Sequence, residues 1–323
     1  MNGYVKTLLI ALKQDELTEP ELTRVRELVP DMNVVVTGDR LEIERLLPDI
    51  EIAFGRFPAA LLKDAPHLAW YQQWSAGADW LLREPELAGR DFTLTNASGV
   101  HSVPIAEHIL AYMLAFARGL PQALRAQSSR TWKGEELDVF ELAGKSLLLV
   151  GVGRIGLHTA RLARALGMRT VGIRRSSADL PEELDSVHVT SELHDLLPDA
   201  DFVVLTVPLT ATTRHMFGRS EFEAMKTGAY LINIGRGATV DEPALVDALR
   251  TGLISGAGLD VFETEPLPED SPLWHMNNVI ITSHYAGNSP MYARRAAGIF
   301  LDNLERHVSG RELKNVVDKK AGY

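Results

Sequence analysis

The chain has 323 residues, a length that favours two domains over one. Its composition, with 46% hydrophobic and 24% charged residues, is typical of a soluble globular protein. A formal net charge of −10 argues against bulk nucleic-acid binding, which needs a basic surface, and the lack of cysteine excludes disulfides, thiolate metal ligands and a cysteine nucleophile.

The N-terminal ten residues hold one lysine and an apolar run too short for a signal peptide, so we expect a first β-strand there. The most apolar longer stretch, 105–117, is interrupted by Glu107 and His108 and is too short to cross a bilayer. We therefore expect a cytoplasmic protein with no membrane partner.

The first hundred residues alternate between strand-like and helix-like segments. Apolar runs of strand length lie at 7–12, 33–37, 50–54, 69–74 and 92–95. Amphipathic segments lie between them at 19–28, 41–47 and 58–62. This alternation predicts βαβ units and a mostly parallel sheet.

A second alternating series follows a helix predicted at 105–118. Its six predicted strands are 146–150, 169–174, 202–206, 230–233, 256–259 and 279–281, and a last helix is predicted from about 289 to 308. Six strands are the number expected of a complete dinucleotide-binding domain. We therefore predict an α/β protein with a Rossmann-type, doubly wound parallel sheet over 102–288. Residues 1–101 with 289–323 would form a smaller, flavodoxin-like α/β substrate domain.

The turn after the strand at 146–150 carries the glycine fingerprint of dinucleotide-binding units. Gly151 permits a tight turn, Gly153 lets the backbone approach a pyrophosphate, and Gly156 lets the following helix pack closely on the strand. Arg154 and Ile155 complete this turn. The phosphates would lie at the helix N-terminus, where unpaired N–H groups favour anions.

The end of the next predicted strand carries Arg174, Arg175 and Ser176, at the place where an acidic residue roughly 20 positions after the fingerprint binds the ribose of NAD. A carboxylate accepts from a free 2′-hydroxyl, whereas guanidinium groups bind a 2′-phosphate. The sequence therefore predicts NADP(H) as the preferred cofactor, with NAD(H) also possible. The alternative is that both arginines are solvated loop charges.

Polar side chains follow three later strands, at the sheet edge where ligands bind. Arg236 lies between two glycines and suits a carboxylate ligand, or alternatively forms a domain-spanning ion pair. Asp260 ends one strand, Glu265 follows it, and His284 follows the next strand. A His and a Glu from neighbouring strand ends form a simple acid–base unit. The other histidines show no metal-ligand spacing, so we expect no metal.

Taken together, these motifs resemble those of the D-isomer-specific 2-hydroxyacid dehydrogenase family over nearly the whole chain. The resemblance implies that Arg236 holds the substrate carboxylate and keto oxygen, that His284 is the acid–base group, and that Glu265 is paired with it. It also implies that the amides of Ala76 and Gly77 bind the substrate carboxylate and that Asp260 lies near the nicotinamide amide. Further cofactor contacts are expected at Val207, Pro208, Thr213, Ile234, Ala286 and Gly287.

Two positions depart from the family pattern. Ser283 replaces the proline common before the histidine, and Arg174 replaces the usual aspartate. The arginine pair most resembles the NADPH-preferring glyoxylate and hydroxypyruvate reductases of the family. Trp74 could shape the substrate pocket or pack in the core, and Arg56 could favour anionic substrates or be a solvated loop residue.

The resemblance implies an NADP(H)-dependent reduction of a 2-keto acid to the D-2-hydroxy acid, and the reverse. A nucleotide-sensing, corepressor-like binding protein is one alternative, and an NAD(P)-dependent phosphite dehydrogenase is another. Formate dehydrogenases pair their histidine with glutamine, so Glu265 argues against that branch. The resemblance also suggests a homodimer through 105–132. There Ile109, Met113, Phe116 and Leu120 form an apolar stripe, although packing on the chain's own second domain is the alternative.

Overall fold

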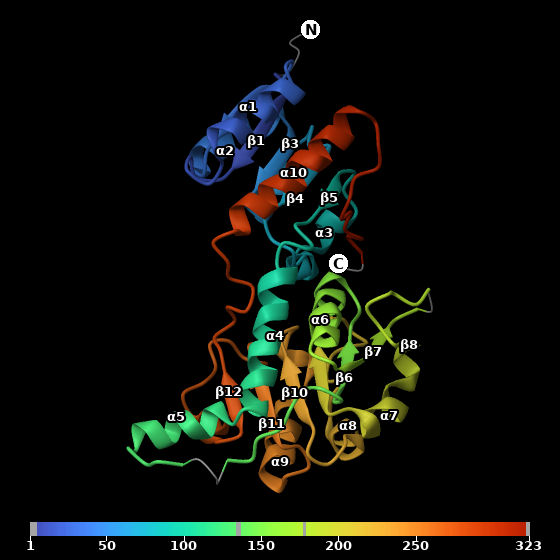
Figure 1. Ribbon diagram of the computed structural model, residues 1–323. Helices are drawn as coiled ribbons and strands as arrows, with labels where there is room; N and C mark the ends of the chain where they lie inside the picture. The colour runs from blue at the N-terminus through green and yellow to red at the C-terminus, as the bar shows by residue number, and fades with distance from the viewer. Residues whose placement is uncertain (1–4, 134–136, 177–178, 321–323) are drawn as a thin grey trace. The chain divides into compact units, whose positions relative to one another are not determined.

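A computed structural model describes residues 5–133, 137–176 and 179–320. The contacts divide the chain into two compact units, which Figure 1 shows and which are described separately below. Unit 1 contains Met1–His101 and Ser289–Tyr323, and unit 2 contains Ser102–Asn288. The chain thus leaves unit 1 just before helix α4 (Ser102–Ala117) and re-enters it just before helix α10 (Tyr292–Val308).

Unit 1 is built on a five-stranded parallel sheet with the order β2-β1-β3-β4-β5. The strands are β1 (Thr7–Ala11), β2 (Asn33–Val36), β3 (Ile50–Gly55), β4 (Trp70–Gln73) and β5 (Thr93–Thr95). The helices are α1 (Glu19–Leu28), α2 (Arg40–Leu46), α3 (Pro85–Ala88) and α10, with 3-10 turns at Leu47–Asp49, Ala59–Asp64 and Asp79–Arg83.

Every side chain of β1 is buried because helices cover both faces of this sheet. Leu8 belongs to the core beneath α1 and α10, and its neighbour Leu9 belongs to the core beneath α2. Helix α10, from the end of the chain, stacks Phe300 on Phe54 of β3 with ring centroids 4.0 Å apart. The C-terminal helix is therefore part of the core of unit 1.

Unit 2 is built on a seven-stranded parallel sheet with the order β12-β11-β10-β9-β6-β7-β8. The strands are β6 (Ser146–Val150), β7 (Arg169–Arg174), β8 (Ser186–Val189), β9 (Phe202–Leu205), β10 (Tyr230–Asn233), β11 (Gly256–Leu259) and β12 (Val279–Ile281). The helices are α4, α5 (Leu120–Ser128), α6 (Arg154–Ala165), α7 (Leu193–Leu196), α8 (Arg219–Ala224) and α9 (Glu242–Thr251). Short 3-10 turns lie at Thr190–Glu192, Leu197–Asp199, Gly237–Thr239 and Pro272–His275.

In unit 2, successive strands are added outward from β6, first on one side (β7, β8) and then on the other (β9 to β12). The order of strand addition therefore reverses between β6 and β9, although all strands are parallel. In doubly wound sheets, ligands bind beyond the carboxyl ends of the strands at such a switch point. Helices α4 and α6 cover one face, and α8 and α9 cover the other, each over its own apolar core. Alternate residues of β6 supply both cores, since Leu149 joins the first and Leu148 the second.

The predicted α/β class with two parallel sheets is confirmed, but the count of six strands in the second series is wrong. The seventh strand, β8, reads Ser-Val-His-Val and lies at the sheet edge with every side chain only half buried. A four-residue edge strand leaves no long apolar run, so the sequence does not separate it from a loop. The segment predicted as amphipathic at 58–62 is a 3-10 turn, Ala59–Asp64.

The apolar stripe predicted on α4 is mostly buried inside unit 2. Ile109, Met113 and Phe116 pack with residues of β6 in the core beneath α4. These three residues therefore pack within the chain's own second domain, which was the alternative to a dimer interface. Leu120, at the start of α5, is 48% exposed. Within the described ranges, no single helix has the length and apolar character of a membrane span; only α4 and α5 taken together, with a 68° bend between them, pass by length and composition.

Candidate functional site

The glycine fingerprint connects β6 to α6 in a turn that leaves no room for side chains at two positions. Gly151 has a φ of +107°, a conformation that favours glycine. A Cβ atom at Gly156 would lie 2.3 Å from the carbonyl oxygen of Gly151, whereas a Cβ at Gly153 would have no atom within 4 Å. Gly156 therefore permits close packing, and Gly153 borders open space.

Helix α6 begins in this turn with Gly153 as its N-cap, so no side chain caps its first N–H groups. Arg154 is exposed and Ile155 is half buried at the first two helical positions. The N-terminus of a helix beside open space suits the pyrophosphate of a dinucleotide, because the helix dipole favours anions there. The turn therefore has the form expected of a dinucleotide-binding turn.

The two glycines give different expected results when each is replaced with alanine. Gly156→Ala forces a backbone shift and lowers the melting temperature, because core clashes of this kind typically cost about 1–3 kcal/mol. Gly153→Ala should leave the melting temperature unchanged, because its methyl group meets no protein atom, but should weaken dinucleotide binding by occupying the open space beside the turn. Thermal denaturation and titrations with NADPH and NADH measure both. Equal melting temperatures of the two variants, or undiminished dinucleotide binding by Gly153→Ala, would contradict this account of the turn.

Arg174 ends β7, beside the glycine turn, and not all of its guanidinium N–H groups have an acceptor. One terminal nitrogen, Nη2, donates to the carbonyl oxygen of Asp179 at 2.8 Å. Its Nε is buried and has no hydrogen-bond partner among the described residues. Arg175 and Ser176 follow with exposed side chains. A buried guanidinium nitrogen without an acceptor fits an anionic ligand such as a 2′-phosphate.

The remaining residues predicted to contact the cofactor follow β9, β10 and β12. Thr213 closes the turn after β9, with its hydroxyl donating to the carbonyl oxygen of Pro208 at 2.7 Å. Val207, in that turn, is half buried, and its carbonyl oxygen would lie 2.8 Å from a Cβ at Gly235. The loops after β9 and β10 therefore touch, and only glycine fits at that contact. Ile234 and Ala286 are buried and Gly287 is half buried, after β10 and β12 respectively.

Arg236 is held by its own backbone in the loop after β10. A Cβ at Gly237 would lie 1.8 Å from the carbonyl carbon of Phe262, so this loop presses directly on the loop after β11. The carbonyl oxygen of Arg236 accepts from Nδ2 of Asn233 at 3.1 Å, and its Nη1 donates to the carbonyl oxygen of Gly235 at 2.9 Å. The guanidinium is half buried and fixed near this edge of the sheet.

His284 and Glu265 are in direct contact. Nδ1 of His284 lies 2.7 Å from Oε2 of Glu265, and Oε1 of the same carboxylate accepts from the amide of Phe262 at 3.0 Å. Because a carboxylate only accepts, Nδ1 carries the hydrogen in this bond. Nε2 has no partner among the described residues, and the side chain is 51% exposed. The ring is therefore oriented by one nitrogen and presents the other.

Asp260 is 2% exposed and holds the loop that carries His284. Its carboxylate accepts from the amides of Tyr285 at 3.1 Å and Ala286 at 3.0 Å, and from the hydroxyl of Thr282. Asp260 and Ala286 are predicted from the sequence as cofactor contacts, but no role is predicted for Thr282. The only feature of the sequence that points to Thr282 is its position two residues before His284.

The predicted substrate amides belong to unit 1, in the loop after β4. Nε2 of Gln73 donates to the carbonyl oxygens of Ser75 at 2.8 Å and Gly77 at 2.7 Å, which fixes the loop. In the part of the chain that the structure describes, the N–H groups of Ala76 and Gly77 have no acceptor. Two adjacent unpaired amides suit a carboxylate. These groups and Arg236 lie in different units.

Trp74 and Arg56 also lie in unit 1, and their surroundings decide between the two readings of each. Trp74 is 7% exposed and packs on Phe54 and Tyr292, so it is a core residue. Arg56 is exposed and donates to both carboxylate oxygens of Glu16 at 2.7 Å, with its guanidinium 5.0 Å from the centre of the Trp74 ring. Its charge is therefore balanced by Glu16.

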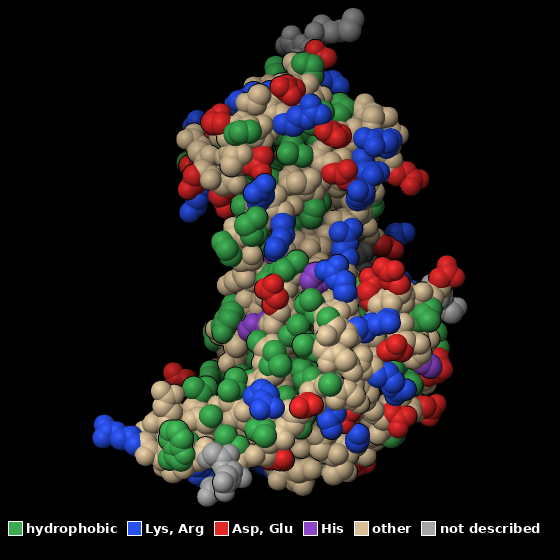
Figure 2. Space-filling model, viewed as in Figure 1, with side chains coloured by type: hydrophobic (Ala, Val, Ile, Leu, Met, Phe, Trp, Pro, Cys, Tyr) green, Lys and Arg blue, Asp and Glu red, His purple; other side chains and the backbone are tan. Residues whose placement is uncertain are grey.

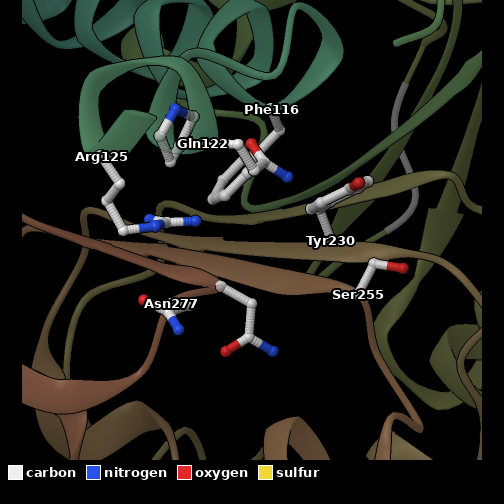
Figure 3. A pocket seen from close by; sticks show the side chains of 8 residues that line it. Phe116, Gln122, Arg125, Tyr230, Ser255 and Asn277 are labelled. Carbon is white, nitrogen blue, oxygen red and sulfur yellow. The ribbon is translucent and has the colours of Figure 1, made fainter. Parts of the chain in front are cut away.

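One pocket of about 210 Å³ lies where strands β10 and β11 of unit 2 begin, and Figure 3 shows the side chains that line it. Phe116, Gln122 and Arg125 line it from α4 and α5, and Tyr230, Ser255 and Asn277 line it from the strand side. Tyr230 starts β10 and Ser255 precedes β11, whereas Arg236 and Asp260 follow these strands. The strands are parallel, so this pocket is at the opposite edge from the predicted site. Over the described ranges, no group of three or more His, Asp or Glu side chains is placed to hold a metal ion.

Residues 110–286 match the family model described as the D-isomer specific 2-hydroxyacid dehydrogenase, NAD binding domain. That match spans the glycine fingerprint, both of the strand ends that carry Arg236 and Asp260, and the loop with His284. It therefore includes every predicted site residue of unit 2 except Gly287.

Two curated relatives and one solved structure illustrate the similarity. The D-3-phosphoglycerate dehydrogenase of Methanocaldococcus jannaschii is 38% identical over 70% of this chain, but the alignment spans only 43% of that protein. The glyoxylate reductase of Korarchaeum cryptofilum is 37% identical, with 81% of this chain and 80% of that protein aligned. The NADPH-dependent glyoxylate/hydroxypyruvate reductase of Sinorhizobium meliloti, solved in complex with NADP and sulfate, is 28% identical and superposes with a TM-score of 0.82 over 98% of this chain and 100% of that chain.

Proposed function

Because the chain belongs to the D-isomer specific 2-hydroxyacid dehydrogenase family of NAD(P)-dependent enzymes, we propose that it reduces a small 2-keto acid to the D-2-hydroxy acid with NADPH. The observation that carries this proposal is the 2.7 Å contact between His284 and Glu265, which leaves Nε2 of the ring available to a substrate. The similarity to a glyoxylate reductase over 81% of this chain, and to the structure of a glyoxylate/hydroxypyruvate reductase over 98% of it, supports a small substrate such as glyoxylate or hydroxypyruvate.

The preference for NADPH rests on the end of β7. Arg174 offers a buried Nε without an acceptor, and Arg175 and Ser176 follow it at the surface. A 2′-phosphate would accept from all three, whereas a free ribose hydroxyl would meet no carboxylate there. The bound NADP in the Sinorhizobium meliloti reductase supports the same assignment. The glycine turn at Gly151, Gly153 and Gly156 would hold the pyrophosphate, and Asp260 would face the nicotinamide amide.

In the proposed reaction, a bound reduced nicotinamide would supply the hydride that the keto carbon of the substrate needs. Arg236 holds the substrate carboxylate and keto oxygen through charge-assisted hydrogen bonds, aided by the amides of Ala76 and Gly77. Protonated His284 donates from Nε2 to the keto oxygen as that oxygen gains negative charge. Glu265 keeps the ring oriented and stabilises its cationic form.

Turnover assays separate this proposal from the other two functions that the sequence allows. With hydroxypyruvate and other 2-keto acids whose products are chiral, NADPH-dependent turnover should give a product that chiral chromatography identifies as the D-2-hydroxy acid; glyoxylate gives achiral glycolate and tests turnover only. An L product would contradict the proposal. Phosphite with NADP⁺, followed by absorbance of the reduced cofactor, tests the phosphite dehydrogenase alternative. Cofactor binding without turnover of either substrate class would instead support a corepressor-like binding protein.

We further propose that two copies of the chain associate through α5 and its flanks. Leu124 is 62% and Trp132 is 99% exposed, and Figure 2 shows hydrophobic side chains gathered over α4 and α5. An exposed apolar patch of this kind is typical of a surface that is buried when two protein molecules associate. Sedimentation analysis should find a dimer that Leu124→Glu converts to a monomer, while Gln127→Glu on the same helix leaves it intact. A monomeric wild-type protein would contradict this proposal.

A further inference from the structure

The hydroxyl of Thr282 joins helix α4 to the loop that carries His284. Thr282 Oγ1 lies 2.5 Å from the hydroxyl of Tyr112 and 3.1 Å from Nε2 of His108, both on α4. The same oxygen donates to the Asp260 carboxylate, which also accepts the amides of Tyr285 and Ala286. Four side chains from three separate parts of the chain thus meet at one oxygen atom.

The direction of each hydrogen bond follows from what each group can donate. The Asp260 carboxylate only accepts, so the single hydroxyl hydrogen of Thr282 points to it. Thr282 then has two lone pairs left, and these accept from the Tyr112 hydroxyl and from Nε2–H of His108. Burial raises the pKa of Tyr112 and lowers the pKa of His108, which keeps both groups neutral and able to donate. The hydroxyl of Thr282 therefore uses its one hydrogen and both of its lone pairs in hydrogen bonds.

Tyr112 is a rigid anchor for this network. The residue is 3% exposed, and a Cβ at Gly258 would lie 2.7 Å from Cγ of its ring, so the ring lies flat against the backbone of β11. Only glycine permits this approach. The hydroxyl of Tyr112 is therefore fixed relative to strand β11, which Asp260 directly follows.

His284 is in a backbone conformation that needs such support. Its φ is +54°, in the left-handed region, where residues other than glycine are uncommon, and such a conformation persists only where the surroundings fix it. The amide of His284 donates to the carbonyl oxygen of Asp260 at 2.8 Å, and the Asp260 carboxylate holds the next two amides. Asp260 thus fixes the backbone at His284, and Thr282 fixes Asp260.

We propose that Thr282 and Tyr112 are positioning residues for His284. Their hydrogen bonds hold the Asp260 carboxylate, which keeps the backbone of His284 in its left-handed conformation and its ring against Glu265. This inference rests on the proposed function and adds to it two residues that act on the acid–base group through the buried carboxylate.

The test compares Thr282→Val with Thr282→Ser, because valine keeps the shape and serine keeps the hydroxyl. A misplacement of about 1 Å at a reacting group costs about 100-fold, so Thr282→Val should lower kcat by about 10–100-fold while the KM for the 2-keto acid changes by less than about threefold. Thr282→Ser should keep kcat within about threefold of the wild type. A merely structural role would lower the melting temperature without this separation of kcat from KM.

Tyr112→Phe provides a second variant that removes one hydroxyl from the anchor and leaves Thr282 in place. If the four groups act as a unit, Tyr112→Phe lowers kcat, and the double variant with Thr282→Val is no slower than Thr282→Val alone. Additive losses in the double variant, or wild-type kcat in Thr282→Val, would overturn the inference. Failure of the proposed function gives a different result, since the wild-type protein would then turn over no 2-keto acid.

Discussion

Replacing His284 with alanine should lower kcat by about 10²–10⁴-fold, the usual contribution of a positioned proton donor. The alanine variant leaves the Glu265 carboxylate in place through its bond to the amide of Phe262, so the loop after β11 keeps its structure. NADPH affinity should be unchanged, because the proposed phosphate contacts lie at the glycine turn and the end of β7. Stopped-flow turnover and a fluorescence titration with NADPH measure the two quantities separately.

Glu265→Gln is the matched control for this variant. Glutamine keeps one acceptor oxygen for Nδ1 of His284, so the ring can keep its hydrogen bond. The NH2 group then faces the amide of Phe262, so the bond to Phe262 and the negative charge beside the ring are both lost. We expect a smaller loss of kcat than in His284→Ala, because the proton donor itself stays in place. Full turnover by His284→Ala would remove this residue from the mechanism.

Replacing Arg174 with aspartate should reverse the cofactor preference. Hydrogen bonds to charged groups contribute about 1.5–3 kcal/mol, and each 1.4 kcal/mol is a tenfold change, so kcat/KM with NADPH should fall by about 10–100-fold. The new carboxylate repels a 2′-phosphate and accepts from a ribose hydroxyl, so kcat/KM with NADH should rise. Steady-state assays with both cofactors at a fixed concentration of one 2-keto acid measure the ratio.

Arg169→Asp controls for the change in net charge. Arg169 starts β7 and Arg174 ends it, so the control makes the same change of charge at the opposite end of the same strand. We expect it to leave the ratio of the two kcat/KM values unchanged. An equal shift in both variants would point to a general charge effect, and an unchanged NADPH preference in Arg174→Asp would refute the assignment of the 2′-phosphate to this residue.

The sequence predicts most of the fold because the central strands are continuous apolar runs. Ser146–Val150 and Phe202–Leu205 are buried along their whole length, so their residue types mark them as strands. The edge strand Ser186–Val189 has no such run and was not predicted. The apolar stripe on α4 shows the converse limit, since the pattern of Ile109 and Met113 cannot distinguish a core of the same chain from an interface.

The same reasoning predicts side chains at strand ends better than the contacts between them. Parallel strands end at one edge, so the sequence places Arg236, Asp260 and His284 together at the edge of one sheet. It gives no sign that Tyr112 reaches Thr282, because these residues are 170 positions apart and Tyr112 lies in an apolar helix. Contacts of this kind depend on how α4 packs on β11, and packing is not encoded in any local pattern.

Oxidation of NADPH and NADH, side by side, against a panel of 2-keto acids that includes glyoxylate and hydroxypyruvate tests the central claim most directly. We predict turnover of at least one of them with NADPH in the ordinary enzymatic range, about 1–10³ per second, and a lower kcat/KM with NADH. Turnover with NADH alone would contradict the role of Arg174. No turnover with either cofactor would contradict the reductase itself.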